Sequence, residues 1–160
     1  MEMLDSRSMP EYFSDLFTYA PVILNDAIHY GDEFERFKLT LKFAFSIIQN
    51  LTIQDAYLKR PFMPKPGDTF EAHLIQQELV NIFMECDYVE HEYIDLLSLK
   101  DVKISCELPT TYIHIESTGK RYEISGYLSY DSRLKGNNLV ISFPGKLKVR
   151  FFDSQEGEED

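Results

Sequence analysis

The spacing of apolar residues along the chain changes period at a proline-rich segment. Before Pro64 and Pro66, large apolar residues recur at steps of three and four, which is the spacing of an amphipathic helix. After these prolines, apolar and polar residues alternate, as in a strand with one buried face. The chain has 160 residues, which is enough for one domain with a sizeable core. The pattern predicts an α+β fold, with N-terminal helices packed on an antiparallel sheet.

The clearer predicted helix covers residues 32–50. Asp32 followed by Glu35 has the form of a capping box. Beyond this start, large apolar residues make one face of the helix: Phe34, Phe37, Leu41, Phe45 and Ile48. Because a helix with so many Phe residues normally packs on a sheet, we expect this face to lie in the core.

A second helical spacing occurs nearer the N-terminus, in Phe13, Leu16, Phe17 and Ala20. Two interpretations stay open for this segment. It is either a short helix packed in the core or a mobile lid over an apolar opening. Residues 1–9 are expected to form a flexible lead, and the acidic residues 153–160 a solvated tail.

Several segments after the prolines are predicted to be strands. They cover residues 69–74, 81–93, 101–108, 111–116, 121–130, 138–143 and 146–152. Between two of them, Ser117-Thr118-Gly119-Lys120 is predicted to be a hairpin loop. Clean alternation gives each strand one dry and one wet face, so we expect the sheet to be partly barrel-like.

Composition limits the partners and the compartment. The formal net charge is -11, and an acidic chain repels phosphate backbones, so nucleic acid is not expected as a partner. The two cysteines, Cys86 and Cys106, are too few for a disulfide framework and indicate a reduced, cytoplasmic setting. No apolar run has the length of a membrane span, so any membrane contact is expected to be peripheral.

No motif in the sequence predicts catalysis, a metal site or a cofactor. None of the histidines has the spacing of a zinc motif, and the neighbours in Glu90-His91-Glu92 would point to opposite faces of a strand. Cys86 and Cys106 have no partner motif, which favours small buried side chains over nucleophiles. We therefore expect a protein that is not an enzyme and that holds neither a metal nor a cofactor.

A cluster of basic residues occurs on one predicted strand face, at Lys146, Lys148 and Arg150. Charges on an edge strand prevent it from pairing with other chains, and this is one interpretation. Attraction to anionic lipid headgroups is the other.

Several segments together resemble the lipid-binding domain of the oxysterol-binding protein-related family. The block Arg60-Pro61-Phe62-Met63-Pro64-Lys65-Pro66-Gly67-Asp68-Thr69-Phe70-Glu71 is similar to the family pattern K-P-F-N-P-x-x-G-E-T-F-E. Arg121-Tyr122-Glu123-Ile124-Ser125-Gly126 and Lys135-Gly136-Asn137-Asn138-Leu139 are similar to two of its strands. The resemblance covers nearly this whole chain but only the front part of the family domain. It implies a shortened lipid-binding domain over residues 10–152.

The family's hallmark, E-Q-V-S-H-H-P-P, is altered. His114-Ile115-Glu116-Ser117 is similar to the family's following H-A-E-S, which places residues 102–109 on the hallmark. Cys106 and Glu107 then stand where the family has two histidines that hold the phosphate of phosphatidylinositol 4-phosphate. A carboxylate would repel that phosphate, so the resemblance implies a degenerate headgroup site and lost phosphoinositide exchange.

The resemblance implies that the protein binds or transfers a lipid, such as a sterol, in an apolar cavity. The residues expected to contact lipid are Phe13, Leu16 and Phe17 in the lid, Phe37, Leu41 and Phe45 in the wall, Arg60 at the mouth, and Phe62. The alternative is a degenerate relative that binds no lipid and acts as an interaction or scaffold module, with a protein partner or as a homo-oligomer.

Overall fold

The computed structural model describes residues 7–55, 62–75, 79–94 and 103–152. Its helical segments are α1 (Met9–Ser14), the 3-10 turn η1 (Asp15–Phe17), α2 (Ala20–Ile28) and α3 (Glu33–Asp55). Its strands are β1 (Thr69–Ile75), β2 (Leu79–Ile94), β3 (Lys103–Ser117), β4 (Tyr122–Ser129), β5 (Asp131–Lys135), β6 (Asn138–Ser142) and β7 (Gly145–Phe151). The predicted α+β class, with helices before an antiparallel sheet, is confirmed.

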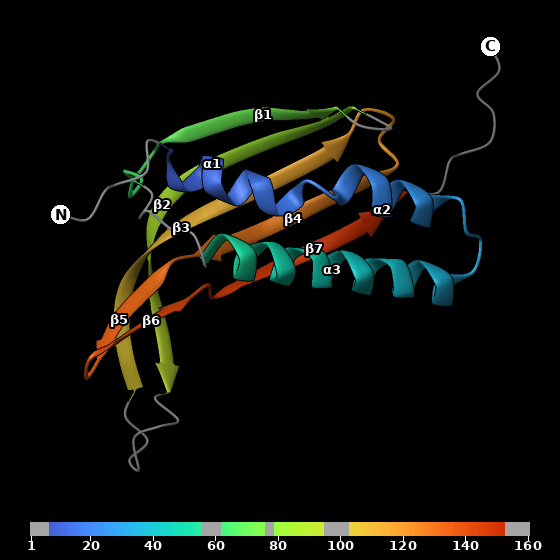
Figure 1. Ribbon diagram of the computed structural model, residues 1–160. Coiled ribbons are helices and arrows are strands. Elements are labelled where there is room, and N and C mark those ends of the chain that lie inside the picture. Colours follow the sequence, from blue (N-terminus) through green and yellow to red (C-terminus); the bar gives the residue numbers. More distant parts are fainter. Residues whose placement is uncertain (1–6, 56–61, 76–78, 95–102, 153–160) are drawn as a thin grey trace.

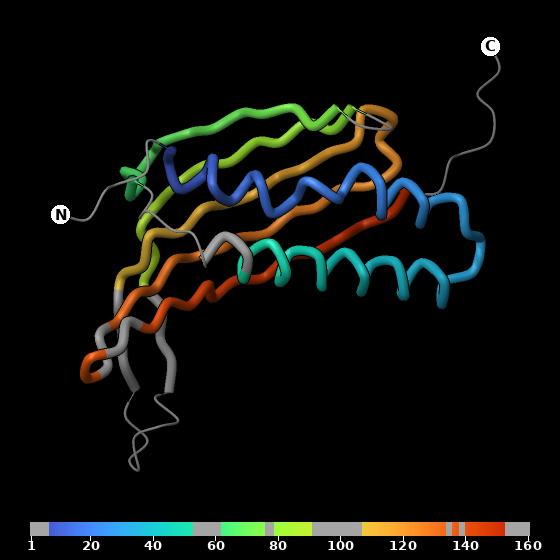
Figure 2. The backbone as a smooth tube through the Cα atoms, viewed as in Figure 1, coloured from blue at the N-terminus to red at the C-terminus, as the bar shows by residue number. Residues whose placement is uncertain are grey.

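The main sheet has five strands in the order β1-β2-β3-β4-β7, and every neighbouring pair is antiparallel. The helices lie over one face of this sheet (Figure 1). β5 and β6 form a separate two-stranded hairpin between β4 and β7. The sheet bends but stays open, since β1 and β7 lie at its two edges (Figure 2).

The first helix begins where its capping residues stand. Ser8 Oγ accepts a hydrogen bond from the Glu11 backbone N at 3.4 Å, and Glu11 Oε2 accepts one from the Ser8 N at 3.3 Å. This capping box, with Pro10 in the first turn, fixes the helix start at Met9. Met9 is buried and begins α1, so the last residue of the flexible lead predicted over residues 1–9 belongs to this helix. Residues 1–6 of that lead lie outside the described residues.

The long helix α3 confirms the helix predicted over residues 32–50 and continues to Asp55. Asp32 Oδ1 accepts a hydrogen bond from the Phe34 backbone N at 2.9 Å, as expected of a capping residue. The Glu35 carboxylate pairs with Lys38 Nζ at 2.6 Å, one turn further on.

One strand replaces the two predicted on either side of Pro109. The backbone O of Pro109 accepts a hydrogen bond from Tyr130 N at 3.0 Å, on the side of β4. In an antiparallel strand the N and O of one residue point to the same side, so the proline nitrogen removes no hydrogen bond to β2. β3 therefore runs without interruption from Lys103 to Ser117. β5, which pairs with β6, was not predicted from the sequence.

The core lies between the helices and the covered face of the sheet. Every second residue of the central strands points into it, as the alternation predicted: Val80, Ile82 and Met84 of β2, Ile113 and Ile115 of β3, and Tyr122 and Ile124 of β4. From the helices, Phe13, Leu16 and Phe17 enter the same cluster, with Phe43 and Ile47 of α3.

The face by which α3 packs was predicted wrongly. We expected Phe34, Phe37, Leu41, Phe45 and Ile48 to lie in the core, but all five are exposed. The core side of α3 instead carries Phe43 and Ile47, which lie on the opposite side of the helix. The sequence holds two apolar sets on this helix, and the larger set is not the one that contacts the sheet.

Candidate functional site

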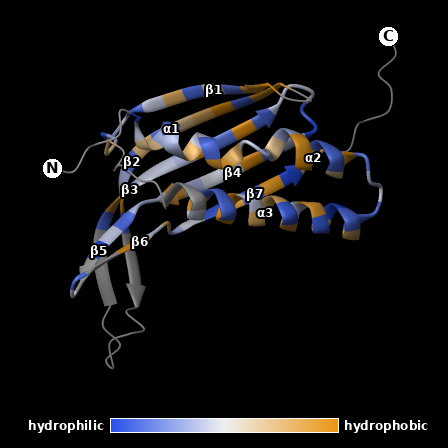
Figure 3. Ribbon diagram, in the orientation of Figure 1, coloured by the Kyte–Doolittle hydropathy of each residue, from blue (hydrophilic) through white to orange (hydrophobic). Residues whose placement is uncertain are grey.

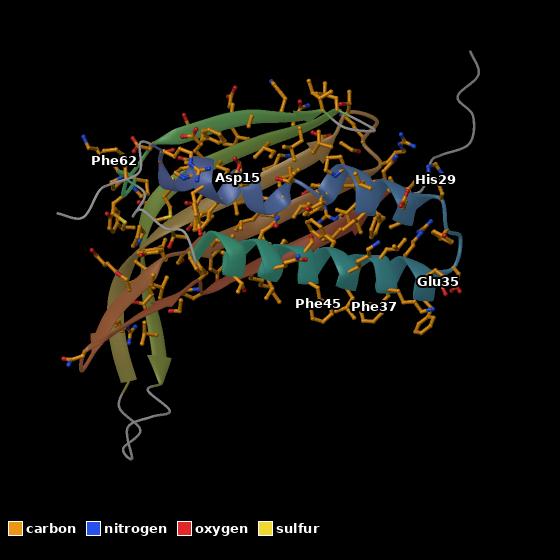
Figure 4. All side chains as sticks on the ribbon, in the orientation of Figure 1. Asp15, His29, Glu35, Phe37, Phe45 and Phe62 are labelled. Atoms are coloured by element: carbon orange, nitrogen blue, oxygen red, sulfur yellow. The ribbon has the colours of Figure 1, made fainter. Side chains whose placement is uncertain are left out.

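The most unusual surface of the described structure is the outward side of α3. The side chains of Phe34, Phe37, Leu41, Phe45 and Ile48 are 60%, 61%, 44%, 61% and 57% exposed. We call these five residues the outer stripe. In Figure 4 the labelled Phe37 and Phe45 point away from the sheet, and hydrophobic residues recur along the length of α3 in Figure 3. A run of large apolar side chains this exposed indicates a contact surface.

The outer stripe makes α3 apolar on two opposite sides. Phe43 and Ile47 are buried against the rest of the protein, and Leu39 and Leu51 pack partly against the same core. A helix that is apolar all round is normally covered on all sides. The signal was present in the sequence, because a wheel at about 100° per residue sets Phe43 and Ile47 opposite Leu41. The prediction rested on the larger set alone.

The polar residues that border the stripe lie mainly along one flank. Lys38 Nζ lies 4.5 Å from the centroid of the Phe34 ring, a cation–π contact. The same ammonium pairs with Glu35, and Lys42 follows one turn later on this flank. None of the five stripe residues is charged. A contact between the stripe and an apolar partner would therefore bury no charged group of the stripe, and no cost of removing a charge from water would arise there.

The residues that were expected to contact lipid lie in different parts of the structure, some in the core and some on the surface. Phe13, Leu16 and Phe17, the predicted lid, are 0% exposed and belong to the core. Their rings pack against other parts of the chain, with centroids 6.1 Å apart for Phe13 and Phe143 and 6.4 Å for Phe17 and Phe43. This arrangement is that of the core-packed helix, the first of the two interpretations offered for the segment.

Phe37, Leu41 and Phe45, the predicted wall, come together but on the outer stripe, on the opposite side of α3 from this core. Phe62 is half exposed and lies far from Phe37 and Phe45 in Figure 4. Its backbone pairs with the start of α1, since Met9 N donates to Phe62 O at 3.1 Å and Phe62 N donates to Arg7 O at 3.1 Å. Arg60 lies outside the described residues. The expected lid and wall therefore do not enclose one common space.

Of the segment that the resemblance places on the family's hallmark, residues 103–109 lie on β3. Its register with β2 sets Glu107 directly opposite Glu90 and Cys106 opposite His91. The Glu107 and Glu90 side chains are exposed, and directly opposite residues of an antiparallel pair share one face of the sheet. Two carboxylates therefore stand together on this part of the sheet. The side chain of Cys106 lies outside the described residues.

Cys86 is buried in β2 rather than placed at a reactive surface. Its Sγ lies 3.5 Å from Thr111 Oγ1, which is within hydrogen-bond reach for sulfur. Burial raises the pKa of the Cys86 thiol, because the charged thiolate loses its hydration. A buried thiol with a raised pKa is a poor nucleophile. Among the described residues, no group of three or more His, Cys, Asp and Glu side chains is arranged to hold a metal ion.

In the described part of the chain, none of the helices combines the length and the apolar character needed to cross a membrane. Comparison with models of known protein families gives no match for this chain. Comparison with curated proteins also gives no match.

Proposed function

We propose that this protein is a non-enzymatic lipid-binding protein that takes its lipid, such as a sterol, against the outer stripe of α3. The observation that carries the proposal is the exposure of five large apolar side chains on one helix face. Flat rings and branched aliphatic groups offer the shape-dependent, largely apolar contact that lipid sites provide. The stripe would form one wall of the lipid site, on the outside of the helical layer.

Two further features support a lipid as the ligand. Phe37, Leu41 and Phe45 are three of the eight residues that the resemblance to the oxysterol-binding protein-related family assigns to lipid contact, and these three are accessible to a ligand. Lys38 and Lys42 stand along one flank of the stripe. An apolar helix face bordered by lysine is typical of helices that lie in a membrane interface. We infer a cytoplasmic protein that meets membranes peripherally while it takes up or releases lipid.

The lipid proposal predicts that removing two rings of the stripe abolishes uptake. With neutral phosphatidylcholine vesicles that contain radiolabelled sterol, the wild-type protein should extract sterol in a saturable way. The Phe37→Ser, Phe45→Ser double variant should extract at least tenfold less. Each of these side chains is 61% exposed and so offers roughly 120 Å² of apolar surface to a lipid, which the variant loses at both sites. Extraction is measured as label in the supernatant after the vesicles are pelleted.

The matched control is Phe83→Ser. Phe83 is also an exposed phenylalanine, but it lies on β2 and points away from the core. Its extraction should equal that of the wild type. If the wild-type protein extracts no sterol, or if the double variant extracts as much as the wild type, the lipid proposal is wrong.

A second prediction concerns the headgroup. Phosphatidylinositol 4-phosphate should not compete with sterol for the protein, because Glu107 and its cross-strand neighbour Glu90 repel a phosphate dianion. The measurement is sterol extraction from vesicles with and without about 5 mol% of that lipid, whose headgroup is anionic. Saturable competition would show that Glu107 does not occupy the degenerate headgroup site.

The second candidate function is a protein-interaction or scaffold module that binds no lipid. One observation favours it: the predicted lid residues Phe13, Leu16 and Phe17 fill the core between the helices and the sheet. Native mass spectrometry of the purified protein separates the two functions. A lipid adduct that the Phe37→Ser, Phe45→Ser variant lacks supports lipid binding, whereas adduct-free protein without extraction activity supports the module.

A further inference from the structure

We propose that the outer stripe is also a self-association surface, by which two copies of the chain pair their α3 helices antiparallel about a twofold axis at Leu41. This inference goes beyond the lipid proposal and does not depend on it. Because both uses occupy the same side chains, a copy that is paired cannot hold lipid at its stripe. The dimer would be the state in which the apolar stripe is covered when no lipid is bound.

The spacing of the stripe is symmetric about its middle residue. From Phe34 the steps to Phe37, Leu41, Phe45 and Ile48 are three, four, four and three residues. An antiparallel twofold at Leu41 therefore sets Leu41 against itself, Phe37 against Phe45 of the second copy, and Phe34 against Ile48 of the second copy. A twofold contact requires one patch that is complementary to itself, and this spacing meets that requirement. Steps of three and four are also those of helices that pack side by side.

The size of the stripe fits a weak dimer. A fully exposed Phe offers about 200 Å² and an aliphatic side chain somewhat less, so the exposed fractions add up to roughly 500 Å² of apolar surface. That value lies in the upper part of the range for the largest apolar patch of a monomer, which is about 300–600 Å². A standard interface buries about 800 Å² on each partner. The stripe alone is smaller than this, and two copies would bury about 1,000 Å² in total, which is the weak end of specific interfaces.

The charges near the stripe allow the contact. Lys38 is paired with Glu35 at 2.6 Å. Lys42 follows on the same flank, and none of the five stripe residues is charged. The net charge of -11 on each copy opposes association over longer distances. Salt screens this repulsion within a Debye length of about 8 Å at physiological ionic strength, so added salt should strengthen the dimer.

Sedimentation equilibrium of the lipid-free protein tests the association. We expect a monomer–dimer equilibrium with a dissociation constant on the order of 10 µM, in the micromolar range of weak, transient contacts. Leu41→Glu should raise that constant at least 100-fold, because it places two carboxylates face to face on the twofold axis. Phe83→Glu, with its charge on the opposite side of the protein, should leave it unchanged. A wild-type protein that remains monomeric at 200 µM, about twentyfold above the expected constant, would overturn the proposal.

Disulfide trapping tests the register. A cysteine introduced as Leu41→Cys lies on the twofold axis and should link two copies on mild oxidation, since bridged Cα atoms are less than about 7 Å apart. Thr52→Cys is the matched control, because Thr52 is also exposed on α3. It lies eleven residues beyond Leu41, so in the antiparallel pair the two copies of residue 52 would be about 33 Å apart along the helices. Equal linking of both variants, or linking of Thr52→Cys alone, would contradict the register. Sterol extraction is measured separately, so a failed dimer and a failed lipid site give different results.

Discussion

Gly126→Ala is expected to cost about 4 kcal/mol of folding free energy, a large part of the roughly 5–15 kcal/mol by which a protein of ordinary stability is folded. Gly126 lies in β4 at φ +156°, and a Cβ there would stand 2.0 Å from Lys146 O and 3.0 Å from Leu147 Cα. Both atoms belong to the backbone of β7, so no side chain can move aside. The alanine must push β7 away from β4 and break the edge of the sheet.

Urea denaturation followed by circular dichroism measures this loss. The control is Gly31→Ala, at a glycine where an added Cβ meets no atom within 4 Å. It should change the free energy of unfolding by no more than about 0.5 kcal/mol. If Gly126→Ala costs less than about 1 kcal/mol, β7 does not approach β4 as the structure has it.

Phe17→Ala should destabilise the protein by about 3–5 kcal/mol, whereas Phe37→Ala should change its stability by less than about 1 kcal/mol. Phe17 is 0% exposed and its ring contacts that of Phe43, so truncation leaves a cavity in the core. Phe37 is 61% exposed on the outer stripe, and its truncation leaves no cavity. Comparing the loss of stability from the same substitution at these two positions thus tests which of them lies in the core and which on the surface.

The two variants are compared by urea denaturation at 1 µM protein, about tenfold below the expected dissociation constant, so that self-association does not contribute. Each is compared with the wild type at the same concentration. A loss for Phe37→Ala that equals the loss for Phe17→Ala would show that the stripe packs inside the protein. In that case both the lipid proposal and the dimer proposal would lose their surface.

The stripe and the filled core together change where a ligand is expected. The resemblance to the oxysterol-binding protein-related family implies a lipid enclosed by a lid and a wall. In this chain the lid residues, such as Phe13, pack in the core, and the wall residues, such as Phe45, face outward. An apolar ligand would therefore meet the protein from outside the helical layer. A ligand at this position would compete with a second copy of the chain, if both proposals hold.

Local sequence signals predicted the elements well where one interaction decides them. The capping residue Asp32 identified the start of α3, because a side-chain oxygen there satisfies a free backbone N–H. Alternation identified β1, β2, β4 and β7 to within a few residues, because side chains on a strand point to opposite faces in turn. The break predicted at Pro109 was wrong, since it depends on which neighbouring strand the proline nitrogen faces.

The order of residues by itself determined the α+β class, the long helix and most of the strands, because capping and periodicity act between residues near in sequence. Only the tertiary structure decided which apolar side of α3 is buried. A helix forms equally well whichever of its two apolar sides is buried. Which side is buried depends on how Phe43 and Ile47 fit among side chains from α1, α2 and the sheet. That fit involves residues far apart in sequence, so the sequence alone did not show that the outer stripe is exposed.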